Sequence, residues 1–86
     1  MPIRVAIVSP EKEVWSGDAD MVVARTTDGD LGVLPGHVPL LGVLAPGGTV
    51  RVKTGSQEIT AEVDGGFISV TRQGVSILAE TATLSG

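Results

Sequence analysis

The chain has 86 residues, ten acidic and six basic side chains, a formal net charge of −4 and no cysteine. This length predicts one domain, residues 1–86, and the lack of cysteine excludes disulfides and thiolate chemistry. An acidic chain with two aromatic residues lacks the basic stripe and stacking rings of a nucleic-acid-binding protein. The sequence has no apolar run of about 18 residues and no signal-peptide core, so the chain is expected to be soluble and cytoplasmic.

Apolar side chains alternate with period two along most of the chain, which predicts short β-strands. The alternation is clearest between Glu58 and Asp64, where Ile59, Ala61 and Val63 are separated by polar residues. The expected strands cover residues 3–8, 12–20, 21–27, 32–34, 40–44, 49–54, 58–64, 67–72 and 75–80. Residues 81–86 carry only a weak pattern. Since no segment has helical spacing over ten positions, less than about 10% helix is expected.

Turn signals separate these strands every 8–12 residues or so, a spacing typical of a β-sandwich or barrel. Hairpin turns are expected at Asp28–Gly29, at Asp64–Gly66 and at Gln73–Gly74. Because each alternating strand has one apolar face, two sheets must pack together. The predicted fold class is therefore all-β, a small sandwich of two mainly antiparallel sheets. Residues expected in its core are Ile3, Val5, Ile7, Ile59, Val63, Val70 and Ile77.

The segment Asp28–Gly47, DGDLGVLPGHVPLLGVLAPG, contains three of the five prolines and the only histidine, His37. Its prolines exclude a regular helix, and its leucine and valine residues make it too apolar for a solvated linker. Pro35–Gly36 and Pro46–Gly47 predict tight turns. From its residues alone the segment is either a structural corner of a β domain or an exposed site for a partner.

Fourteen consecutive positions, Asp28–Leu41, resemble a signature of the epsilon subunit of F-type ATP synthases. That family carries an acidic-Gly-acidic-Leu-Gly-(Ile/Val)-x-Pro-x-His-x-Pro-Leu-Leu run. The resemblance extends to Val8–Pro10 followed by Trp15–Gly17, to Val63–Phe67 and to the closing stretch Val75–Ala82, so it covers nearly the whole chain. Asp64–Phe67 and Gly74–Glu80 resemble actinobacterial members of the family.

The resemblance implies a ten-stranded β-sandwich that is not an enzyme and needs no cofactor or metal. As a rotor subunit of the central stalk, it would link the gamma subunit to the c ring during proton-driven ATP synthesis. It would lie on the cytoplasmic face of the cell membrane, as a peripheral subunit that meets the membrane only through the complex. The loop that faces the c ring corresponds to Asp28, Gly29, Asp30, Leu31 and Gly32. The residues implied to lie against gamma and the c ring are His37, Val38, Pro39 and Leu40.

Members of this family usually continue into a C-terminal helical hairpin, which inhibits ATP hydrolysis and in some members binds ATP. This chain stops near the point where those helices would begin, so neither role is expected of it. Two other functions stay open. A biotinyl or lipoyl carrier domain needs an exposed hairpin lysine, for which Lys53–Gly55 is the nearest candidate and Lys12 the only other lysine. A stand-alone adaptor would bind a peptide along a sheet edge.

The residues predict no active site. One histidine without cysteine is a poor basis for a zinc site. The glycines at 29, 32 and 36 do not spell a phosphate-binding loop, since no lysine or helix follows them. We therefore expect a non-enzyme.

Overall fold

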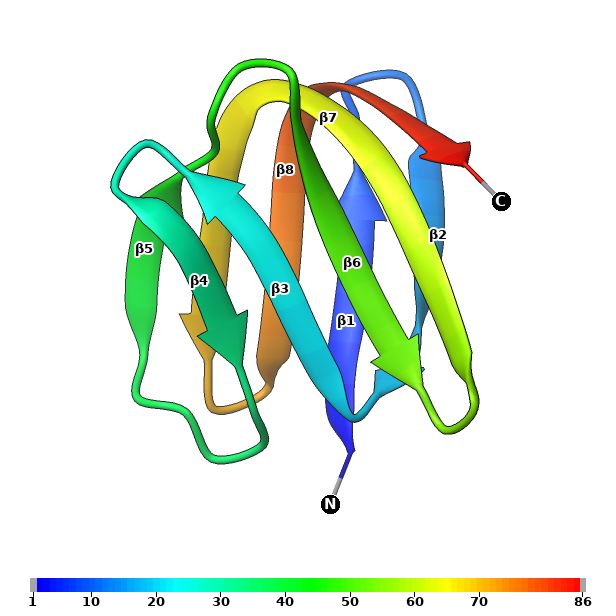
Figure 1. Ribbon diagram of the computed structural model, residues 1–86, viewed down its shortest axis with the longest axis vertical. Coiled ribbons are helices and arrows are strands. Elements are labelled where there is room, and N and C mark those ends of the chain that lie inside the picture. Colours follow the sequence, from blue (N-terminus) through cyan, green and yellow to red (C-terminus); the bar gives the residue numbers. More distant parts are fainter. Residues whose placement is uncertain (1, 86) are drawn as a thin grey trace.

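The computed structural model describes residues 2–85, which form two packed layers of β-strands (Figure 1). These residues contain no helix, and hence none that could cross a membrane. The strands are β1 (Ile3–Val8), β2 (Glu13–Ala19), β3 (Met21–Thr26), β4 (Gly29–Val33), β5 (Leu40–Val43), β6 (Gly48–Thr54), β7 (Gln57–Thr71) and β8 (Gly74–Ser85). The expectation of an all-β sandwich with almost no helix is confirmed.

Strands β7 and β8 are long enough to belong to both layers. Hydrogen bonds join the strands in the order β2-β1-β8-β7-β6-β3-β4, and β5 pairs with β7 beside this path. The first half of β7 pairs with β6 and its second half with β5, while the first half of β8 runs parallel to β1. One layer thus holds β4, β3 and β6, the other holds β2, β1 and β5, and the β7–β8 pair arches between them (Figure 1).

The ten separate strands implied by the family resemblance are eight continuous strands in the structure. The difference arises because β7 and β8 each contribute one segment to both layers.

The hairpin expected at Asp64–Gly66 is wrong, because β7 continues through these residues and bends from one layer into the other. Gly65 and Gly66 have φ angles of 74° and 109°, which glycine adopts readily because it has no Cβ. A Cβ on Gly66 would overlap the carbonyl oxygen of Leu78 and lie 2.8 Å from the Cα of Ala79. The pair of glycines therefore permits a close passage of two strands. The weakly patterned tail after Glu80 follows the same bend as the end of β8.

The core lies between the layers, and all the buried side chains among the described residues are apolar. Of the seven residues expected there, six are at most 7% exposed, whereas Ile59 is only partly buried and packs against the core. Ile59 is the third residue of β7, next to the turn that joins β6 to β7. Trp15 also packs against the core from β2. A domain of this size buries only about 60% of its unfolded surface, so each buried contact is a large share of its stability.

Candidate functional site

The two groups of residues expected to contact partners lie along one edge of the sandwich, the first in the turn before β4 and in β4 itself, the second in the loop after β4. Strand β4 pairs only with β3 and β5 only with β7, and the loop of residues 34–39 joins these two edge strands (Figure 1). The turn with Asp28 precedes β4, and the loop with His37 follows it. The first group, Asp28–Gly32, thus occupies the turn and four of the five residues of β4, and only residues 33–36 separate it from His37. Since a strand rises about 3.3 Å per residue, the turn with Asp28 and the loop with His37 lie roughly 15 Å apart at the two ends of β4. The structure therefore places Asp28 and His37 on two surfaces rather than one.

Thr26 shapes the turn between β3 and β4. Its hydroxyl accepts a hydrogen bond from the N–H of Asp28 at 3.2 Å and donates one to the carbonyl of Gly29 at 2.7 Å. The sequence had suggested Asp28–Gly29 as the centre of the turn. Instead Thr27 and Asp28 form the centre, and Gly29, with φ of 116°, begins β4. A primed turn is not formed, since it requires a positive φ that no described non-glycine residue adopts.

We expect Thr26→Val to lower the free energy of unfolding by about 1 kcal/mol, because two hydrogen bonds at an exposed turn are exchanged for bonds to water. Thr27→Val is the matched control. The Thr27 hydroxyl forms none of the hydrogen bonds found in residues 2–85, so its loss should change stability by less than about 0.5 kcal/mol. Urea unfolding followed by Trp15 fluorescence measures both. Equal losses in the two variants would contradict the role assigned to Thr26.

Asp30 is already paired within the hairpin. Its Oδ1 lies 2.6 Å from Nε of Arg25, the residue directly opposite on β3. Both side chains are more than half exposed, so the pair stabilises the hairpin by less than about 1 kcal/mol. Within residues 2–85, Asp28 forms no ion pair. Asp28 therefore carries the unpaired carboxylate at the hairpin tip, while the charge of Asp30 is partly balanced.

The loop after β4 folds around Pro35–Gly36, and this confirms the expected turn. The N–H of His37 donates to the carbonyl of Leu34 at 3.1 Å, and Gly36 has φ of 83°, as the second central position of a type II turn requires. Nδ1 of His37 lies 2.7 Å from the carbonyl of Val38. Because a carbonyl only accepts, Nδ1 carries the proton in this contact, which leaves Nε2 to meet another group.

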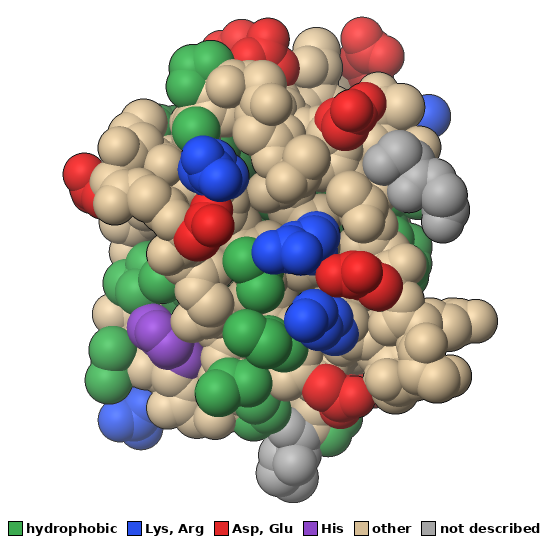
Figure 2. Space-filling view, viewed as in Figure 1, with side chains coloured by type: hydrophobic (Ala, Val, Ile, Leu, Met, Phe, Trp, Pro, Cys, Tyr) green, Lys and Arg blue, Asp and Glu red, His purple; other side chains and the backbone are tan. Residues whose placement is uncertain are grey.

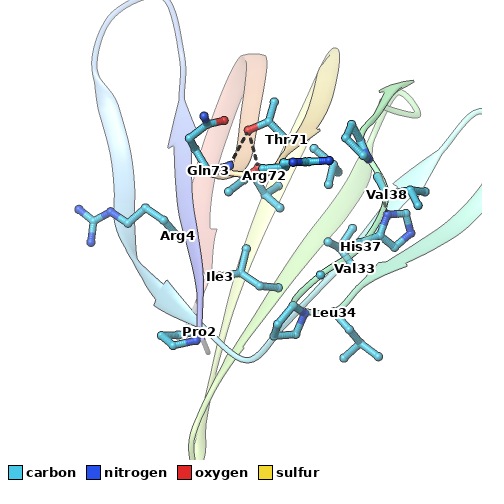
Figure 3. Close-up of a pocket in the computed structure, with 16 residues that line it drawn as sticks. Pro2, Ile3, Arg4, Val33, Leu34, His37, Val38, Thr71, Arg72 and Gln73 are labelled. Atoms are coloured by element: carbon cyan, nitrogen blue, oxygen red, sulfur yellow. Dashed lines mark hydrogen bonds between the residues drawn. The ribbon is translucent and has the colours of Figure 1, made fainter.

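His37 borders a cavity of about 410 Å³ at the end of the sandwich (Figure 3). The cavity lies between the start of β1, the loop of residues 34–39 and the turn from β7 to β8. Figure 3 shows the side chain of Arg72 extending from that turn toward the loop with His37, whereas Arg4 points away. Among the described residues, no three acidic or histidine side chains are grouped to hold a metal ion.

Hydrophobic side chains are also exposed outside the lining of this cavity. Val43, Phe67 and Leu78 stand opposite one another on β5, β7 and β8 and form an apolar row. Figure 2 shows the single histidine, at the left of the view, among hydrophobic side chains. The sequence analysis missed the exposure of Phe67. The signal was present in the sequence, because Val70 was expected in the core and residues three apart on a strand face opposite sides.

Known proteins that are similar to this chain in sequence are ATP synthase epsilon chains. A model of the family described as "ATP synthase, Delta/Epsilon chain, beta-sandwich domain" matches residues 2–85. The ATP synthase epsilon chain of Frankia casuarinae is 89% identical over 85 residues, which are 99% of this chain and 100% of that protein. The epsilon chain of Streptomyces coelicolor is 55% identical over 96% of this chain and 67% of its own length, and that of Thermobifida fusca is 54% identical over 94% and 61%.

Solved structures share the fold. A chain in the cryo-EM structure of the Euglena gracilis mitochondrial ATP synthase, which contains OSCP, F1 and the c-ring, superposes with a TM-score of 0.88 at 27% identity and covers 96% of this chain and 53% of that chain. A chain in the central stalk and c-ring structure of the Tetrahymena thermophila mitochondrial ATP synthase superposes with a TM-score of 0.76 at 20% identity. The match covers 93% of this chain and 64% of that chain, and it supports the fold alone. From the family model and these relatives, the chain belongs to the ATP synthase epsilon chain family, which it matches over the β-sandwich domain.

Proposed function

We propose that the chain is a non-catalytic subunit of the central stalk of an F1Fo ATP synthase and links the gamma subunit to the c ring. The observation that carries the proposal is the 89% identity over the whole length of an ATP synthase epsilon chain. The shared fold with a chain of an F1 and c-ring assembly supports it. In this role the chain is a peripheral part of a membrane complex, on the cytoplasmic face, and contributes to ATP synthesis coupled to proton transport without a cofactor of its own.

The geometry suits a subunit with two partners, because it offers two surfaces of different chemistry. The hairpin tip, with Asp28–Gly32, presents carboxylates, and we assign it to the c ring, whose polar loops are typically basic. The surface at the other end of β4, with His37–Leu40, presents apolar groups beside His37 and Arg72. We assign this second surface to gamma, where it also approaches the c ring. Opposite charges at the two ends would favour one orientation over its reverse.

The two other functions have less support. Lys53 lies within β6, opposite Glu58 on β7, and not on an exposed turn as a carrier lysine does. Lys12 follows the turn after β1, where its carbonyl accepts hydrogen bonds from Ser9. A stand-alone adaptor could use the free edges of β4 or β5. Membership of the epsilon chain family favours the rotor role over both.

Reconstitution from purified parts tests the proposal. The unmodified chain should form a discrete complex with the gamma subunit of its own synthase in sedimentation velocity, and that complex should attach to the detergent-solubilised c ring. The intact mass should equal the mass of the bare polypeptide. A chain that binds neither gamma nor a gamma–ring assembly would contradict the proposal, and a mass raised by a biotinyl or lipoyl group would favour the carrier function.

A further inference from the structure

We infer that the cavity beside His37 is a binding site for an apolar side chain adjoining a carboxylate, both supplied by a protein partner at this end of the sandwich. The inference rests on the proposed function, which names gamma as that partner, and adds the chemistry by which the partner is held. Four features of the cavity support it: its charge, its apolar interior, the fixed turn at its mouth and its exposed rim.

The cavity is lined by basic and neutral side chains although the chain as a whole is acidic. Arg4, His37 and Arg72 are among its lining residues, and no aspartate or glutamate is. Arg4 is engaged by Asp18 at 3.6 Å and points away from the cavity (Figure 3). Arg72 forms no ion pair with any other residue in the part of the chain described. A carboxylate at the mouth would therefore meet an uncompensated guanidinium, which binds carboxylates through charge-assisted hydrogen bonds.

The interior of the cavity is apolar. Its lining includes Ile3, Val33, Val70 and Val75, which come from four strands and are at most 7% exposed. These side chains form the end of the hydrophobic core and are already almost fully buried, so they give the cavity an apolar floor. A hydrophobic group lying against this floor would cover the exposed side chains of Leu34 and Val38 and remove their apolar surface from water. The volume of about 410 Å³ accommodates one or two such side chains.

The turn that presents Arg72 is held in place. Thr71 Oγ1 accepts the N–H of Gln73 at 3.2 Å and is 3.4 Å from the carbonyl of Gly74, as the dashed lines in Figure 3 show. This repeats the arrangement of Thr26 at the other hairpin. Gly74 has φ of 149° and passes so close to the backbone of Arg4 that a Cβ would overlap the Arg4 carbonyl oxygen. A fixed turn loses less conformational freedom on binding.

The rim indicates a protein rather than a small molecule. Leu34 and Val38 border the cavity and are 56% and 69% exposed. A small carboxylate held inside would leave both side chains in water. A protein surface that inserted one side chain would cover them, and an apolar contact surrounding a buried anchor is typical of protein interfaces.

A small probe tests the chemistry of the cavity without gamma. Sodium hexanoate, an apolar chain with one carboxylate, should bind with millimolar affinity and shift the backbone amide signals of residues 33–34, 36–38 and 71–75 in a saturable way. Hexylammonium, of equal length and opposite charge, should not. Arg72→Gln should weaken hexanoate binding about threefold, and Arg51→Gln, on β6 and outside the cavity, should leave it unchanged. Absence of saturable hexanoate shifts at these residues would overturn the inference.

Binding to gamma tests the source of the ligand. Arg72→Glu should weaken the complex with gamma about fivefold, Arg72→Lys much less, and the matched reversal Arg51→Glu less than twofold. A thermal melt confirms that each variant is folded. Equal losses in Arg72→Glu and Arg51→Glu, or hexanoate binding with no effect of Arg72→Glu on gamma, would overturn the assignment to a partner side chain. If the unmodified chain does not bind gamma, the proposed function fails, and the hexanoate result alone decides the chemistry of the cavity.

Discussion

Gly66→Ala is expected to cost about 4 kcal/mol or more of folding free energy, enough to leave a domain of this size largely unfolded. Two terms add up at this position. The φ angle of 109° is one that residues with a Cβ rarely adopt, at a cost of about 1–3 kcal/mol. The new methyl group would also overlap the backbone at Leu78 and Ala79, which cannot move without breaking the pairing of β7 with β8.

Gly65→Ala is the matched control for this prediction. Its φ of 74° is also positive, but a Cβ there would meet only the Glu80 side chain, at 3.8 Å and beyond. The cost should therefore be the backbone term alone, about 1–2 kcal/mol. Urea unfolding followed by the fluorescence of Trp15 and by far-ultraviolet dichroism gives both values. If the two variants unfold at the same urea concentration, the close passage of β8 at Gly66 is not what requires glycine.

The strands could be predicted from the sequence because period-two alternation is a local property, but the bend in β7 could not. Buried positions change from odd numbers, Ala61 and Val63, to even numbers, Ile68 and Val70. A hairpin at Gly65 and a bend between layers both explain such a change. Only the strand pairing distinguishes the hairpin from the bend: β7 pairs with β8 both before and after the glycines. This pairing joins residues far apart in the sequence, which a local pattern does not report.

The turns that frame the candidate site could be predicted from the sequence, but its chemistry could not. Proline and glycine placed the turns at Pro35–Gly36 and near Asp28, whereas the contact role of the segment stays a prediction from the family signature. The ion pair of Asp30 with Arg25 was not predicted. The residue that lies opposite Asp30 on β3 depends on which residues form the turn between β3 and β4. The sequence also did not predict that His37 and Arg72 line the same cavity. His37 lies in the loop that crosses from β4 in one layer to β5 in the other, and Arg72 lies in the turn from β7 to β8, so their approach is a result of how the layers pack.

Exchanging the charges of Arg25 and Asp30 is expected to weaken attachment to the c ring while leaving the domain folded. The single change Asp30→Lys gives an ambiguous result, because it also places two cations opposite each other on β3 and β4, at a cost of up to about 1 kcal/mol. In the double variant Arg25→Asp with Asp30→Arg, the cross-strand ion pair is kept with reversed polarity. Its free energy of unfolding should lie within about 0.5 kcal/mol of the parent, and the net charge is unchanged.

The exchange reverses the charge at position 30 and at its partner position 25, so the net charge and the ion pair stay the same. If the hairpin tip meets basic loops there, the exchanged variant should bind the ring between about tenfold and a hundredfold more weakly at low salt, because like charges face each other across the contact. The deficit should shrink as salt screens the repulsion.

The measurement is sedimentation of gamma complexes of the parent and the variant with the solubilised c ring, beside a urea titration of each isolated chain. Asp28→Lys, which changes the unpaired carboxylate, should weaken binding as well. Parent-like binding by the exchanged variant would show that Asp30 serves the hairpin alone, and a tip that contacts the ring would then depend on Asp28.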